Sequence, residues 1–156
     1  MKNVGKLISF IDTELKSNMK DLVIAYDKNR YELFGKYRID SSTTLTKVID
    51  VTSMECNEFS SLKNAVVYCT LTDAGKYAES RRLQFIDLKL SSLQTDIQIH
   101  RKILKTSNDA ESRCIYTTKL QEDSYKRKLL IEEINTYINS SKMILAAKLN
   151  RNFNLK

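Results

Sequence analysis

Proline is absent from the 156-residue chain, and glycine occurs only three times, as Gly5, Gly35 and Gly75. Proline stops helices and shapes tight turns, so its absence leaves long helices uninterrupted and argues against an all-β fold with many turns. With 42% hydrophobic and 29% charged residues, the chain is long enough to bury one core and polar enough for exposed helices. We therefore expect a mainly α protein in which residues 1–156 form a single helical domain.

Residues and motifs that carry catalytic chemistry are also scarce. His100 is the only histidine, and the three cysteines, Cys56, Cys69 and Cys114, show no CxxC spacing that would favour a zinc site or a disulfide framework. The chain contains no GxxxxGK[ST], GxGxxG, GxSxG or HExxH motif. We predict a protein that is not an enzyme, with no cofactor and no metal. His100 is expected to be a packed or hydrogen-bonded core residue, with a pH-sensitive contact as the alternative.

Long apolar runs are missing as well. The longest, residues 65–69, is far too short to cross a bilayer. The amino terminus reaches Asp12 too early for the apolar core of a signal peptide. Together with three cysteines that we expect to be reduced thiols, these features predict a cytoplasmic protein with no membrane partner.

The strongest positive signal is a seven-residue apolar repeat in the middle of the chain. Its steps of three and four residues are typical of a helix packed against a partner helix. The repeat predicts an interface and favours a homo-oligomer formed by coiled-coil packing, with another protein as a further possible partner. Its members are Leu83, Ile86, Leu90, Leu93, Ile97, His100 and Leu104.

Apolar spacing and capping signals predict three helices. The first covers 3–34 and ends before Gly35, which is suited to the left-handed position after a helix. The second covers 53–106, beginning at a capping-box pair, Thr52 and Glu55, with Gly75 marking either a kink or a close backbone approach. The third covers 109–150. The insert at 36–52 is rich in Tyr, Ile, Val and Thr and is open to two interpretations, a β-hairpin or an irregular loop.

The short break at 107–108 predicts that the second and third helices form a long antiparallel hairpin. Matching residues across this break places Leu90 beside Tyr125 and His100 beside Ile115. The same register brings Arg81 and Arg82 near Glu133 and Glu132, and Asp87 near Lys128. Because exposed ion pairs contribute only about 0.2–1 kcal/mol each, opposite charges at two levels support this register without deciding it.

Basic charge is concentrated in the part of the chain assigned to the hairpin. The formal net charge is +7, which favours nucleic acid, acidic proteins or anionic lipid as partners. Lysine and arginine can neutralise phosphates, and an exposed tyrosine can stack on single-stranded bases. The competing interpretation is a solvated helix face, because acidic residues are interleaved with the basic ones. The candidate nucleic-acid-binding residues are Arg81, Arg82, Lys89, Arg101, Lys102, Lys105, Tyr125, Lys126, Arg127 and Lys128.

These observations lead to three functional hypotheses. The first is a non-enzymatic interaction or assembly protein that acts through its helical surfaces as a homo-oligomer. The alternative is a basic nucleic-acid-binding accessory protein of recombination, replication or packaging type, with single-stranded nucleic acid as partner. The third is an inhibitor that docks on a larger enzyme.

Overall fold

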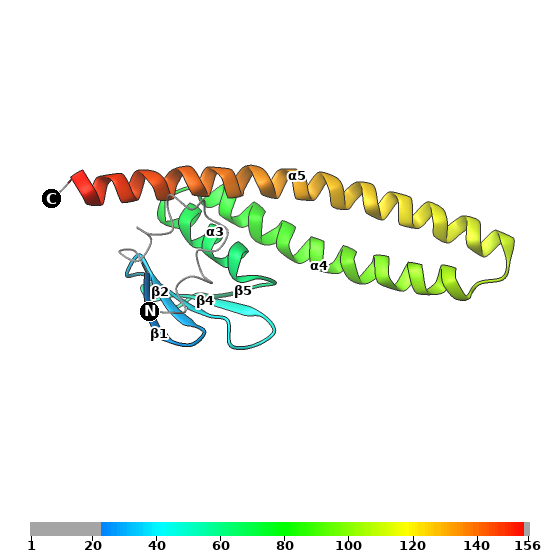
Figure 1. The fold of residues 1–156 in the computed structure, drawn as a ribbon, viewed down its shortest axis with the longest axis horizontal. Helices are drawn as coiled ribbons and strands as arrows, with labels where there is room; N and C mark the ends of the chain where they lie inside the picture. Colours follow the sequence, from blue (N-terminus) through cyan, green and yellow to red (C-terminus); the bar gives the residue numbers. More distant parts are fainter. Residues whose placement is uncertain (1–22, 155–156) are drawn as a thin grey trace.

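The structure is a computed structural model that describes residues 23–154, with side chains described as far as Lys148. A five-stranded antiparallel sheet comes first in the chain, followed by three helices (Figure 1). The strands are β1 (Val23–Asp27), β2 (Arg30–Leu33), β3 (Tyr37–Asp40), β4 (Thr46–Asp50) and β5 (Cys56–Phe59), and the helices are α3 (Leu62–Asp73), α4 (Tyr77–Thr106) and α5 (Ala110–Asn154).

The sheet is a simple meander in which each strand pairs with the next, in the order β1-β2-β3-β4-β5. Alternate side chains along each strand point to opposite faces. One face is buried and apolar, with Tyr31, Leu33, Ile39, Val48 and Phe59 each no more than 1% exposed. The other face is open and carries most of the charged residues of the strands.

Helix α3 lies between the sheet and the two long helices and joins two apolar clusters. Its residues Ala65, Val66 and Cys69 pack with the buried face of the sheet and with Leu145 of α5. Its residues Val67 and Leu71 pack in a second cluster with Leu83 and Ile86 of α4 and with Ile134 and Ile138 of α5. Because α3 contributes to both clusters, the sheet and the long helices share one continuous core.

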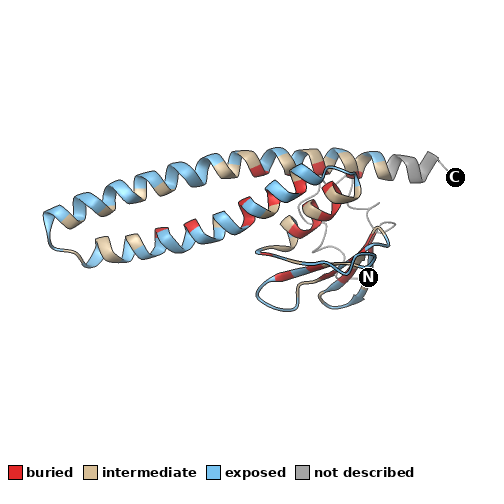
Figure 2. Ribbon diagram, turned by 180° about the vertical axis from the view of Figure 1, so that it is seen from behind, coloured by how far each residue is buried: buried red, intermediate tan, exposed pale blue. Residues whose placement is uncertain are grey.

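Helices α4 and α5 run antiparallel and extend together well beyond the sheet (Figure 1). At 1.5 Å per residue they are about 45 Å and 68 Å long. Ile97 is the last buried residue of α4, and Ile134 is the first buried residue of α5. The segment 98–133, which we call the outer arm, therefore contains no fully buried residue, and Figure 2 shows it almost entirely exposed or intermediate. None of the described helices combines the length and apolar composition needed to cross a bilayer.

The predicted mainly α class is wrong because five strands precede the helices. That residues 1–156 form a single domain stays a prediction. Residues 3–22 of the first expected helix lie outside the described residues, but residues 23–33 form β1 and β2. In this segment Val23, Tyr31 and Leu33 are buried through strand pairing, and this tertiary burial overrides the helix-like apolar spacing. Gly35 is left-handed as expected, with φ of 68°, but it lies in the turn between β2 and β3.

The insert 36–52 does contain a hairpin, in which β3 pairs with β4, but this hairpin is part of a larger sheet.

The prediction of one helix over 53–106 is also wrong, both at its start and at its middle. Thr52 and Ser53 donate their backbone amides to the Asp50 carboxylate in a turn, and β5 follows. Helix α3 begins later, where the Ser61 hydroxyl accepts the Asn64 amide.

Gly75 separates α3 from α4, and the predicted close backbone approach is not present. A Cβ atom built on Gly75 would meet nothing within 4 Å, and its φ is 80°. The amides of Gly75 and Lys76 donate to the carbonyls of Thr72 and Leu71, which is the pattern of a Schellman cap. The final helix begins at Ala110, close to the expected 109, and is capped by Asp109, which accepts the Ser112 amide.

Candidate nucleic-acid interface

The apolar repeat on α4 forms the seam between α4 and the rest of the chain. Leu83, Ile86, Leu93 and Ile97 are buried, and Leu90 is half-buried. Further out, His100 and Leu104 are also half-buried. The predicted interface residues are thus packed against the chain's own helices, and the repeat leaves little apolar surface for a second chain.

Three of the pairs predicted along this seam are not formed. Tyr125 is 63% exposed and does not cover Leu90. The Nδ1 atom of His100 lies 2.9 Å from an Asp123 carboxylate oxygen, and its ring contacts Tyr116 rather than Ile115. Asp87 is buried and accepts hydrogen bonds from the Ser60 amide, the Ser60 hydroxyl and the Asn64 side chain rather than pairing with Lys128.

One ion pair crosses the helices close to the expected level. Arg82 donates to both carboxylate oxygens of Glu133, at 2.6 and 2.9 Å. These bonds lower the pKa of Glu133 below its ordinary value. Tyr137 donates to the same carboxylate, and burial, followed by this hydrogen bond, raises the pKa of Tyr137 to about 12. This cluster lies on one flank of the seam.

The other flank of the seam forms a face whose exposed members, from Ser91 to Lys105 on α4 and from Thr117 to Lys128 on α5, include no carboxylate; we call it the acid-free face. It begins at a groove of about 460 Å³ that Ser91 and Gln94 of α4 and Arg127 of α5 help to line. Residues that are three, four or seven positions apart on a helix lie on the same side of it. We therefore assign to this face the residues that follow the groove residues at these spacings. Its members are Ser91, Gln94, Gln98, Arg101 and Lys105 on α4 and Thr117, Gln121, Ser124, Arg127 and Lys128 on α5; all are exposed.

The charge on this face is entirely positive. Arg101, Lys105, Arg127 and Lys128 supply four cations, and the other members are uncharged amides or hydroxyls. At the end of the arm Arg113 donates to the carbonyls of Leu104 and Ser107, which adds a cation at the carboxyl terminus of α4. A group of exposed basic side chains produces a positive potential that attracts polyanions.

The opposite flank has mixed charge and is less suited to a polyanion. Arg82 is paired with Glu133, and Lys119 lies 4.9 Å from the centre of the Tyr116 ring. Lys89 and Lys126 line a groove on this flank, and the same phase of the two helices also carries Asp96 and Glu122. The remaining predicted residues, Arg81, Lys102 and Tyr125, lie on the outer surfaces of the helices, away from the seam. The structure therefore gathers four of the ten candidates on one face.

Arg127 is the member of this face that the sequence analysis undervalued. It lies seven residues from Leu120 and from Ile134, so it has the phase of the seam, where an apolar residue would pack. It is exposed instead and lines the groove beside Leu90 and Ile131. An arginine in the apolar phase of an otherwise regular repeat is the signal that could have identified it.

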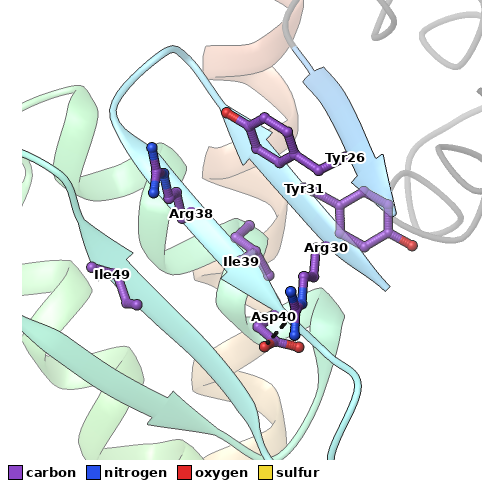
Figure 3. Close-up of a pocket in the computed structure, with 7 residues that line it drawn as sticks. All are labelled: Tyr26, Arg30, Tyr31, Arg38, Ile39, Asp40 and Ile49. Atoms are coloured by element: carbon purple, nitrogen blue, oxygen red, sulfur yellow. Dashed lines mark ion pairs between the residues drawn. The ribbon is translucent and has the colours of Figure 1, made fainter. Parts of the chain in front are cut away.

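A second cavity, of about 360 Å³, lies on the open face of the sheet (Figure 3). Arg30 and Asp40 face each other across neighbouring strands at 3.6 Å, and hydrogen bonds donated by Ser42 hold the pKa of Asp40 below its ordinary value. Strand pairing also sets Arg38 opposite Glu32. Each cation here has an acidic neighbour, so this cavity lacks the unbalanced charge of the arm.

Within residues 23–154, no group of three or more His, Cys, Asp or Glu side chains is arranged to hold a metal ion. Comparisons with protein-family models, with curated proteins and with solved structures find no match to this chain. The site therefore has to be interpreted from its own residues.

Proposed function

We propose that the protein is a non-enzymatic nucleic-acid-binding protein that holds the phosphate backbone along the acid-free face of its arm. The supporting observation is that four exposed cations lie on one side of the α4–α5 pair with no carboxylate among them. Cations that contact phosphates release condensed counterions, and this release drives binding that is independent of sequence.

The dimensions of the face suit a short stretch of backbone. From Thr117 to Lys128 the α5 row extends about 17 Å, and the α4 row from Ser91 to Lys105 about 21 Å, at 1.5 Å per residue. A duplex rises 3.4 Å per nucleotide of each strand, so the face spans roughly six nucleotides. Four phosphate contacts would give a salt slope, the change in log K with log salt, of roughly −3.6 for a duplex or −2.8 for a single strand.

Fluorescence anisotropy with a labelled 20-nucleotide single strand and the matching duplex tests this proposal. The test variant is Arg101→Gln/Arg127→Gln/Lys128→Gln. The matched control, Arg81→Gln/Lys119→Gln/Lys126→Gln, removes the same number of cations from the outer surface and the opposite flank. At 100 mM salt we expect the test variant to lose more than about tenfold in affinity and its slope to fall by roughly 2 to 3.

The control variant should stay within about threefold of the wild type, because charges more than a Debye length of about 10 Å from the phosphates are largely screened. Equal losses in the two variants would show that only the total charge matters and would contradict a face-specific interface. An absence of binding to both oligonucleotides at 50 mM salt would contradict nucleic-acid binding altogether.

A further inference from the structure

The flank of the α4–α5 pair opposite the acid-free face carries four large apolar side chains that are about half exposed, of which Phe85 has the Arg82 guanidinium over its ring, 5.1 Å from the ring centre. Phe85 and Ile99 on α4 are 52% and 50% exposed, and Ile115 and Leu129 on α5 are 47% and 46% exposed. Phe85 and Leu129 line the same groove, of about 350 Å³, together with Lys89 and Lys126. Four similar exposures at related positions indicate a surface rather than scattered residues.

These four side chains form two pairs with the same spacing on both helices. Phe85 and Ile99 are fourteen residues apart, as are Ile115 and Leu129, so each pair keeps one phase along its helix. Phe85 and Leu129 share a groove, so ideal antiparallel helices place Ile99 near the level of Ile115, about 21 Å further out. Such a face has an apolar contact at each end and polar residues between them.

The pattern matches itself under a two-fold rotation. An axis through the level of Ser92, midway between Phe85 and Ile99, places the inner apolar level of one copy on the outer apolar level of another. The same rotation brings Lys89 of each copy to within one residue, about 1.5 Å, of the level of Asp96 of the other. On α5 the axis passes at Glu122, and the rotation brings Lys119 of each copy near Lys126 of the other, with the two Glu122 carboxylates between these lysines.

We infer that two copies of this chain associate through this face, with their arms antiparallel and Phe85 against Ile99. Equal spacing of the apolar levels and the opposite charges of Lys89 and Asp96 favour a second copy over an unrelated partner. Arms overlapping by about 30 Å, each about 20 Å wide, would bury about 1,200 Å² in total, which is the lower limit for specific interfaces. The dimer is therefore expected to dissociate on dilution.

Sedimentation velocity and light scattering over a wide concentration range test the association, with charge reversal as the diagnostic. Lys89→Asp and Asp96→Lys should each weaken the dimer more than about tenfold, because each creates two like-charge contacts across the axis. The double variant Lys89→Asp/Asp96→Lys restores both contacts and should dimerise within about threefold of the wild type. Gln94→Lys, on the acid-free face of α4, is the control and should leave dimerisation unchanged.

Crosslinking tests the geometry separately. In a Cys56→Ser/Cys114→Ser background, Ser92→Cys should oxidise to a disulfide-linked dimer, because position 92 lies at the axis. Ser91→Cys, one residue away but on the acid-free face, should not. A monomer at every concentration would overturn the inference, as would a dimer that is crosslinked at position 91 and insensitive to Lys89→Asp. These measurements use no nucleic acid, so they succeed or fail independently of the proposed function.

Discussion

Gly75 is the residue whose backbone conformation divides the helical part of the chain. Its φ of 80° ends α3 and allows the chain to turn into α4, and no neighbouring atom lies within 4 Å of the position that a Cβ would occupy. Glycine is therefore needed here for its left-handed conformation and not for space.

Gly75→Ala should lower the free energy of unfolding by about 1 to 2 kcal/mol, which is the cost of placing an alanine in the left-handed region. Urea denaturation followed by circular dichroism measures this change. Gly75→Asn is the control and should lose less, because asparagine tolerates this conformation better than alanine. A loss above about 4 kcal/mol for alanine would indicate a steric clash and would contradict the open surroundings of the residue.

At the scale of elements, α5 has a charged residue at a position where its apolar repeat would place a packed one. Arg127 has the phase of Leu120 and Ile134 but lies exposed in the groove beside Leu90, which is only half-buried. An exposed arginine at an apolar position of the repeat is consistent with a functional role.

Arg127→Leu should therefore separate stability from binding. Leucine can pack on Leu90 and Ile131, so the free energy of unfolding should rise by about 1 kcal/mol, part of the value of a buried leucine. Binding to the labelled oligonucleotides should weaken, with the salt slope smaller by about 0.7 to 0.9. Lys126→Leu, on the opposite flank, is the control for lost charge. Unchanged affinity of Arg127→Leu together with greater stability would mean that Arg127 plays no part in binding.

The same elements show how far the sequence could predict this fold. The strict repeat from Leu83 to Leu104 does identify a helix, because burial of one side of α4 imposes the spacing directly. Residues 23–33 could not be assigned in this way, since their apolar spacing suits a helix and only pairing with β3 makes them strands. Thr52 and Glu55 likewise match a capping box, but the Asp50 carboxylate takes the amides of Thr52 and Ser53 instead.

The candidate site was predictable in composition but not in arrangement. Basic residues on the two long helices are visible in the sequence, whereas their distribution over the two flanks depends on the helix register. The predicted register placed Lys128 beside Asp87, which the structure buries against Ser60 and Asn64. Only the observed packing shows that Arg127 and Lys128 share a face with Arg101 and that Lys89 and Lys126 do not.

For the whole molecule, the two proposals have a joint consequence that neither has alone. If two arms associate through the flank that carries Phe85 and Ile99, the acid-free face of each copy points outward, on opposite sides of the paired arms. One dimer would then hold two segments of nucleic acid at once. Linking two binding faces raises the effective concentration of the second segment, so bridging should occur at concentrations at which one face alone binds weakly.

Energy transfer between two populations of duplex, each labelled with a different dye, measures such bridging. The wild type should raise the transfer signal at protein concentrations where it is dimeric, and excess protein should abolish the signal by placing a separate dimer on every duplex. Phe85→Ser/Ile99→Ser leaves the charge unchanged, so it should bind a single duplex with an affinity within about threefold of the wild type but give no transfer. Full transfer by this variant would show that bridging does not depend on the dimer, and a wild type that binds and dimerises without transfer would place the two acid-free faces on the same side.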